Sequence, residues 1–285
     1  MGILDLSIVF AYLIFIVIIG VVFGKEEKNT RDFFIGNRQV PWIAVLLSII
    51  ATEISAATFL SVPATGYKEN LSYIQFGLGS ICAKFFIAFA FIGVFYKYDC
   101  VTVYEYLAKR FGNKTRFTAA IFYFFNCILG AGVRLLIAAT GLSVLMGWPL
   151  YVTLIIFTVT TVVYTALGGI KAIVWTDVPQ ALIFIGSGIA ALVFIVSQVP
   201  GGWEKIISIA EPAGKLSLFK WSPDLPANGT FIENTKAWLN DSSIFWIAFL
   251  NAFITSCAAF GTNQDMTQRM LTCKDVRSSQ KSLII

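Results

Sequence analysis

Residues 49–63 read Ile-Ile-Ala-Thr-Glu-Ile-Ser-Ala-Ala-Thr-Phe-Leu-Ser-Val-Pro, a polar cluster of small side chains inside an otherwise apolar run. The run is long enough to cross a membrane as a helix, and Glu53 falls near its middle. Ala, Ser and Thr most often form a seam where membrane helices pack closely. A carboxylate at that depth is costly unless it is paired or hydrated, so Glu53 favours a functional role over packing alone.

The whole chain has the composition of a membrane protein. Apolar residues make up 57% and charged residues 13%, against roughly 45–50% and about 25% in a soluble domain. The apolar residues form blocks long enough for membrane helices, and we expect one transmembrane domain over residues 1–285. The predicted spans are residues 5–24, 41–63, 72–96, 116–146, 149–167, 179–199 and 243–262.

Loop charges predict the orientation. Fourteen Lys and Arg lie on one side of the predicted spans, namely Lys25, Lys28, Arg31, Arg38, Lys97, Lys109, Arg110, Lys114, Arg116, Lys171, Arg269, Lys274, Arg277 and Lys281. The opposite side has five, namely Lys68, Lys205, Lys215, Lys220 and Lys236. Because Lys and Arg favour the cytoplasmic side, the N-terminus and the loop 200–242 are predicted to lie outside a plasma membrane.

The segment between the third and fourth spans has a different character. Residues 102–111, which end at Gly112, have the pattern of a short amphipathic helix on the cytoplasmic surface, with tyrosines suited to the membrane interface.

Several functional classes are disfavoured. The cations lie in short loops without clustered stacking aromatics, so nucleic acid is not an expected partner. The chain has no histidine, and its five cysteines are scattered, with neither a disulfide framework nor metal-ligand spacing. With no clustered acid pair either, an enzyme is disfavoured.

Three charged residues fall inside predicted spans: Glu53, Lys84 and Arg134. One acid can neutralise only one of the two cations, and an unpaired charge in a membrane is expensive. We predict that Glu53 pairs with Lys84, whose stem is flexible, and that Arg134 meets an anionic group of a solute. Guanidinium stays charged and binds carboxylates through two parallel hydrogen bonds.

The second and seventh spans are the two that carry polar interruptions. Residues 251–256 and 261–269 repeat the pattern of residues 51–58. Paired discontinuous helices of this kind mark solute and ion sites in transporters built from inverted repeats. Asp177, just before the sixth span, has two interpretations from local sequence alone: an acid in the first turn of a helix or a functional carboxylate.

Four motifs occur in a recognisable order: residues 51–55, residues 104–112, Gly168-Gly169 through Trp175-Thr176-Asp177 and Gln180, and Asn263-Gln264-Asp265 through Gln268-Arg269. In this order they resemble the sodium:solute symporter family, which includes sodium-coupled sugar, proline, sialic acid, pantothenate and monocarboxylate carriers. The similarity covers essentially the whole chain. It implies an all-α, leucine-transporter-like fold of five-plus-five inverted repeats, with the first span as an extra helix.

The same resemblance implies where a sodium ion would bind. Backbone carbonyls at Ala51 and Ile54 match one half of a sodium site, whose hydroxyl half belongs to a helix beyond this sequence. Asp177 matches a carboxylate at a second sodium, and Arg134 resembles an arginine that holds a substrate carboxylate. Glu53 stands where sialic acid carriers have a hydroxyl residue. The chain is expected to stop after about the first helix of the second repeat.

The predicted function is sodium-coupled symport of a small polar organic solute by alternating access, with Na+ as coupling ion and a carboxylated solute as one option. The expected solute-binding residues are Thr52, Glu53, Ser55, Thr58, Gln75 and Arg134, of which Gln75 is assigned from its place in the third span alone. The expected sodium-binding residues are Ala51, Ile54 and Asp177. A solute sensor or regulatory subunit and a membrane enzyme are the alternatives. The chain alone is not expected to drive sodium-dependent uptake.

Overall fold

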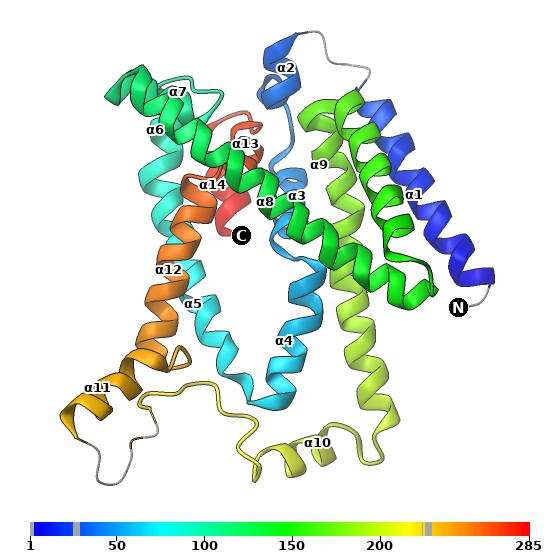
Figure 1. The fold of residues 1–285 in the computed structure, drawn as a ribbon, viewed down its shortest axis with the longest axis vertical. Helices are drawn as coiled ribbons and strands as arrows, with labels where there is room; N and C mark the ends of the chain where they lie inside the picture. Colours follow the sequence, from blue (N-terminus) through cyan, green and yellow to red (C-terminus); the bar gives the residue numbers. More distant parts are fainter. Residues whose placement is uncertain (1–2, 25–28, 224, 226–229) are drawn as a thin grey trace.

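The computed structural model describes residues 3–24, 29–223, 225 and 230–285, which form a bundle of helices (Figure 1). The first half contains α1 (Ile3–Gly24), α2 (Thr30–Ile35), η1 (Gly36–Arg38), α3 (Trp42–Glu53), α4 (Ala56–Lys68), η2 (Leu71–Tyr73), α5 (Ile74–Ile87), η3 (Ala88–Ile92), α6 (Gly93–Lys97), α7 (Val103–Phe111) and α8 (Asn113–Met146). The second half contains α9 (Leu150–Gln198), α10 (Gly202–Ala210), α11 (Phe231–Asn240), α12 (Phe245–Gly261), α13 (Gln264–Leu271) and α14 (Val276–Ile284).

Four segments are long and apolar enough to cross a membrane by length and composition: Leu6–Phe23, Leu71–Lys97, Asn113–Met146 and Gly168–Gln198. The bent pair of α11 and α12 makes a fifth. Two shorter apolar helices, Trp42–Glu53 and Leu150–Val163, lie where the second and fifth spans are predicted. The seven predicted spans therefore remain a prediction, with an apolar helix at each position.

The connection between the fifth and sixth predicted spans differs from expectation. α9 consists of two helices joined at a sharp kink at Gly169, and residues 170–178 belong to the second helix instead of to a loop. Gly169 has φ 49° and ψ −156°, a conformation that side chains with a Cβ rarely adopt, and it marks a kink. The kink redirects the second half of α9.

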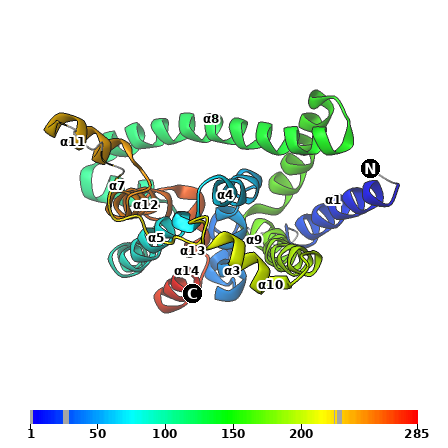
Figure 2. The same ribbon diagram turned by 90° about the horizontal axis from the view of Figure 1, so that it is seen from below.

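Close helix contacts arrange the bundle. α5 packs along α12, and α9 packs against both α1 and α3 (Figure 2). A Cβ atom at Gly79 would overlap the backbone carbonyl of Phe249, so the absence of a side chain lets α5 and α12 approach closely.

A buried apolar cluster anchors the first half of α3. It includes Val45 and Ile49 of α3, Ile92 of η3, Val174 of α9 and Met270 of α13. The π-helical turn η3 adds a polar tie, because the Ala88 carbonyl accepts a hydrogen bond from Gln280 Nε2 at 2.9 Å. α3 is therefore fixed by neighbours from both halves of the chain.

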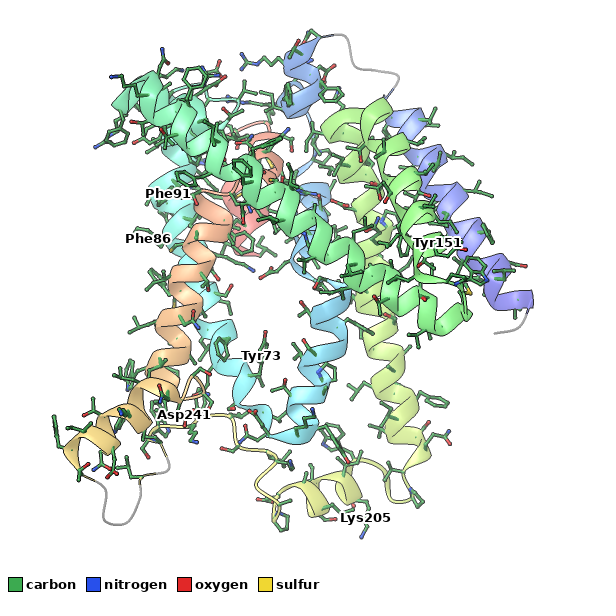
Figure 3. All side chains as sticks on the ribbon, in the orientation of Figure 1. Tyr73, Phe86, Phe91, Tyr151, Lys205 and Asp241 are labelled. Carbon is green, nitrogen blue, oxygen red and sulfur yellow. The ribbon has the colours of Figure 1, made fainter. Side chains whose placement is uncertain are left out.

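The two ends of the molecule carry different segments. α2, α7 and α13 lie toward one end, and α10 and α11 lie at the other (Figure 1). Lys205 and Asp241 mark that second end (Figure 3). α10 and α11 are short helices within the predicted outer loop of residues 200–242. α7 lies where the amphipathic helix is predicted, and Thr102 and Gly112 are the residues that cap its two ends.

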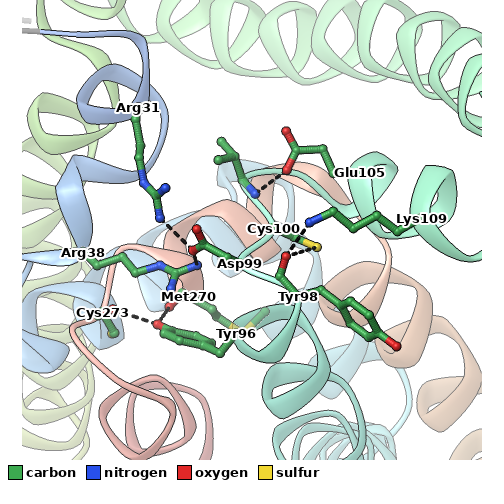
Figure 4. Close-up of polar contacts among 11 residues, drawn as sticks. Arg31, Arg38, Tyr96, Tyr98, Asp99, Cys100, Glu105, Lys109, Met270 and Cys273 are labelled. Carbon is green, nitrogen blue, oxygen red and sulfur yellow. Dashed lines mark hydrogen bonds and ion pairs between the residues drawn. The ribbon is translucent and has the colours of Figure 1, made fainter.

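Ion pairs hold the segment between α1 and α3 in place (Figure 4). Arg31 and Arg38 both bind Asp99 Oδ1, at 2.7 and 3.0 Å. Arg38 also stacks over the ring of Tyr96, 4.6 Å from its centroid, and the Tyr96 hydroxyl donates to the Cys273 carbonyl at 2.8 Å. The hydrogen bond from the Arg31 guanidinium lowers the pKa of the Asp99 carboxyl below its ordinary value.

Candidate functional site

The second predicted span is broken at its polar cluster. α3 ends at Glu53, and Ile54 and Ser55 are extended, with ψ values of 112° and 163°. The Ile54 amide still donates to the Ile50 carbonyl at 3.0 Å, but the helix stops there. The last carbonyls of a helix lack intrahelical donors, so the break exposes carbonyl groups of the last turn, including that of Ala51.

Side chains stabilise the start of the next helix. Ser55 caps α4 by accepting a hydrogen bond from the Thr58 amide at 3.2 Å, and the hydroxyls of Ser55 and Thr58 lie 3.0 Å apart. A serine at this position satisfies an amide that would otherwise lack a partner. Ser55 and Thr58 therefore stabilise the first turn of α4 at the break.

A cavity of about 340 Å³ lies beside this break. Its lining residues are Thr52, Arg134, Thr165, Ile170, Ile173, Asp177, Asp265, Gln268 and Arg269. Three of the nine predicted site residues, Thr52, Arg134 and Asp177, come together there from α3, α8 and α9. A larger cavity of about 620 Å³ lies between α7, α8 and α12, and its described lining residues include no charged side chain. We therefore take the smaller cavity as the candidate site.

Asp177 is held by partners that local sequence does not identify. Ser48 Oγ donates to Asp177 Oδ2 at 2.6 Å, and Arg269 Nη2 and Nε reach the same oxygen at 3.3 and 3.4 Å. Arg269 Nε also donates to Ser48 Oγ at 2.9 Å. The first-turn interpretation of Asp177 is wrong, because the second helix of α9 begins at the Gly169 kink and places Asp177 about two turns beyond it.

The Asp177 cluster contains two residues that were not among the predicted site residues. Arg269 belongs to a motif noted in the sequence, yet a motif does not say which carboxylate its arginine contacts. Ser48 precedes Thr52 by one helical turn, and the Thr52 hydroxyl donates to the Ser48 carbonyl at 2.8 Å. Extending the polar face of residues 52–55 back by one turn would have included Ser48.

Glu53 and Lys84 form the predicted ion pair. Lys84 Nζ lies 2.7 Å from Glu53 Oε2 and 4.8 Å from the centroid of the Phe260 ring. The side chains of Lys84 and Glu53 are 20% and 39% exposed. The two charges neutralise each other between α3 and α5, as charge counting predicts.

Arg134 is the third of these charges, and it has a different environment. Within the part of the chain that the structure describes, no acidic side chain forms an ion pair with Arg134. The two acids of the cavity contact other residues. Asp177 forms an ion pair with Arg269, and Asp265 Oδ1 accepts a hydrogen bond from the Tyr123 hydroxyl at 2.8 Å. Arg134 is thus a cation at a cavity whose acids have other partners.

Gln75 lies away from this cavity and serves the outer loop. Its amide nitrogen donates to the carbonyls of Ser72 and Ser243, at 2.9 and 3.0 Å, and its amide oxygen accepts from the Lys220 amide at 3.1 Å. The side chain is fully buried. These bonds fix the loop between α10 and α12 against the start of α5.

The chain is similar in sequence to a family of sodium-coupled carriers. The model of the sodium:solute symporter family matches residues 33–285. A sodium-coupled monocarboxylate transporter 2 of Danio rerio is 31% identical over 259 residues, which cover 90% of this chain and 39% of that protein. A sodium/sialic acid symporter of Proteus mirabilis is 27% identical, with 99% of this chain and 54% of that protein covered. The human sodium/iodide cotransporter is 27% identical, with 91% and 38% covered.

A solved structure shares the arrangement of helices. A Na+-coupled sialic acid symporter in a substrate-bound, outward-open state matches 99% of this chain and 57% of that chain, with a TM-score of 0.87 and 25% identity. The fold is therefore the leucine-transporter-like one that the motifs imply. The chain spans about half or less of the length of these curated relatives.

Proposed function

This chain belongs to the sodium:solute symporter family, and from that premise we propose that it takes part in sodium-coupled symport of a small carboxylated solute by alternating access. Na+ moving down its gradient would supply the free energy, and the cavity beside the α3–α4 break would hold the solute. Arg134 carries the proposal, because it is the cation of that cavity with no ion pair to an acid of the described residues.

The chemistry of Arg134 favours an anion. A guanidinium stays charged, and its planar donors match a carboxylate through two hydrogen bonds. A charge left unpaired in a membrane is costly, so a bound anion would lower the free energy of the occupied state. The names of three relatives refer to monocarboxylate, sialic acid and iodide, which are all anions or acids.

The broken helix supports a sodium site. Na+ prefers oxygen ligands, and broken membrane helices can offer their carbonyls to ions. We place a sodium ion at the carbonyls of Ala51 and Ile54, next to the end of α3. Asp177 would serve a second ion through Oδ1, since its hydrogen bonds to Ser48 and Arg269 are all made by Oδ2.

The remaining predicted residues take distinct roles in this proposal. Thr52 lines the solute cavity, and Glu53 balances Lys84 beside it. Ser55 and Thr58 stabilise the break beside the cavity. Gln75 shapes the outer loop instead of contacting solute.

We propose that this integral membrane protein lies in the plasma membrane with its N-terminus outside. The support is the excess of loop cations on the side of α2, α7 and α13. Its partners would be the solute, sodium and the lipid bilayer, and not nucleic acid.

Replacing Arg134 tests the solute site. Arg134→Lys keeps the charge but loses the planar pair of donors, so we expect affinity for a carboxylate to fall by roughly tenfold. The measurement is sodium-dependent binding of radiolabelled lactate and N-acetylneuraminate to purified protein, with iodide as a spherical anion. Thermal unfolding of the same samples reports stability.

Arg116→Lys is the matched control, because Arg116 lies on the same helix at its exposed start. It should leave binding and stability unchanged. If Arg134→Lys binds every probe as well as the original protein but unfolds at a lower temperature, Arg134 is a structural residue and the carboxylate site is wrong.

A further inference from the structure

A second polar pocket lies at the end of the molecule that carries α2 and α7. It has a volume of about 260 Å³ and is lined by Tyr98, Tyr106, Lys109 and Arg110. Lys109 Nζ donates to the Tyr98 carbonyl at 2.5 Å, and Arg110 Nη1 donates to the Tyr106 hydroxyl at 3.0 Å (Figure 4 shows the Lys109 contact). Two cations and two phenols therefore face one small space, without an acid among the residues that line it.

The acids near this pocket are occupied by other groups (Figure 4). Asp99 binds Arg31 and Arg38. Glu105 Oε2 accepts a hydrogen bond from the Val101 amide at 2.7 Å, inside the turn that leads into α7. Neither carboxylate forms an ion pair with Lys109 or Arg110 in the part of the chain that the structure describes.

Further cations flank the pocket. Lys97, Lys114 and Arg116 are exposed, and no ion pair links them to an acid among residues 3–24, 29–223, 225 and 230–285. Across residues 97–116 five Lys or Arg face two acids, Asp99 and Glu105. This segment therefore presents a positive surface.

The exposed side chains of α8 show where the membrane surface lies. Residues 113–116 are exposed and polar, whereas the exposed side chains that follow are mainly apolar, with Thr118 and Asn126 as polar exceptions among Phe117, Ile121, Phe122, Phe124 and Phe125. The change from polar to apolar marks the boundary between headgroups and hydrocarbon. α7 packs against α8, and only Gly112 separates the end of α7 from the start of α8, so the pocket lies at headgroup depth. Phe111, next to Arg110, is 59% exposed and suits the same boundary.

We propose that the pocket of Tyr98, Tyr106, Lys109 and Arg110 binds the phosphate of an anionic phospholipid in the leaflet that faces α7. The guanidinium of Arg110 and the ammonium of Lys109 would neutralise the phosphate, and the phenols would donate hydrogen bonds to it. Clusters of Lys and Arg on an amphipathic helix at a membrane surface attract anionic lipids in this way. The leaflet is the cytoplasmic one only if the orientation proposed above is correct, but the lipid site itself does not require sodium coupling.

The test measures lipid binding to the purified protein. The probe is phosphatidylglycerol added to detergent micelles, with phosphatidylcholine as the neutral lipid, and the readouts are bound lipid by native mass spectrometry and the shift in unfolding temperature. The double variant Lys109→Gln/Arg110→Gln should lower the affinity for phosphatidylglycerol by roughly tenfold or more. The double variant Lys205→Gln/Lys236→Gln removes the same charge from exposed positions on α10 and α11 and should bind like the original protein.

If both double variants lose the same affinity for phosphatidylglycerol, binding depends on net charge alone and the proposal is overturned. Protection by glycerol phosphate as strong as that by the intact lipid would also overturn it, because the site would then be one for soluble phosphate. Sodium-dependent binding of the carboxylate probes is measured on the same samples. It should survive in the Lys109→Gln/Arg110→Gln variant, so the lipid site and the proposed function can fail independently.

Discussion

Glu53 and Lys84 show how one pair of residues sets the charge of a membrane cavity. Because they lie 2.7 Å apart, their charges cancel, and Arg134 keeps the net positive charge of the three. Glu53 occupies a position where related sialic acid carriers are expected to have a hydroxyl residue. The Glu53 carboxylate is matched here by the Lys84 ammonium on α5, so the pair adds no net charge.

Removing one partner of this pair should destabilise the protein, because it leaves a charge without compensation. We expect Glu53→Gln and Lys84→Met each to lower the free energy of unfolding by about 1 to 2 kcal/mol, given the partial exposure of both side chains. The loss of unfolding free energy in the double variant should be smaller than the sum of the losses in the two single variants. A double-mutant cycle measured by unfolding in detergent gives the coupling energy, and additive losses would show that the contact is not stabilising.

At the scale of elements, the Asp99 carboxylate ties together several segments at the end that carries α2 and α7. Asp99 lies in the turn between α6 and α7 with φ 47°, and Arg38 of η1 also has a positive φ, 58°. Two arginines from the segment between α1 and α3 converge on this acid. The tie joins α6 and α7 to the start of α3, the helix that ends at the candidate site.

Asp99→Asn tests this tie without changing the backbone preference, because Asn also tolerates positive φ. The arginines lower the pKa of Asp99, so its stabilisation is present above the ordinary pKa, near 4, and is lost as the pH falls through the lowered value. We expect a loss of about 1 kcal/mol or less at pH 7, which shrinks below pH 4, in unfolding measured across that range. Glu204→Gln, at an exposed acid of α10, should show no such pH dependence.

At the scale of the whole molecule, the native cysteines are poor reporters of orientation. Cys100 and Cys273 lie on the side predicted to be cytoplasmic, but both are buried. Burial raises the pKa of both thiols, that of Cys273 to about 12, so little reactive thiolate forms at neutral pH. Labelling of these two residues would report opening of the structure as much as sidedness.

Introduced cysteines at exposed positions test the orientation directly. An impermeant maleimide should label Lys236→Cys, on α11, in intact cells, and Lys274→Cys, between α13 and α14, only after the membrane is permeabilised. The reverse pattern would place the N-terminus inside and the five-cation side in the cytoplasm.

The sequence by itself determined the features that depend on neighbouring residues. Apolar blocks located the helices, and Thr102 and Gly112 bounded α7. The charges inside the predicted spans, with the flexible stem of lysine, paired Glu53 with Lys84. These features follow from hydrophobic length, local capping and charge balance, which the linear chain already contains.

Only the tertiary structure decided which distant groups meet. Asp177, about two turns beyond the kink at Gly169, meets Arg269 of α13 and Ser48 of α3. Gln75 lies at the start of the third predicted span, but its side chain bonds to the outer loop and does not line the cavity. Such contacts depend on helix rotation, and a shift of one residue turns a side chain by about 100°, which local sequence does not fix.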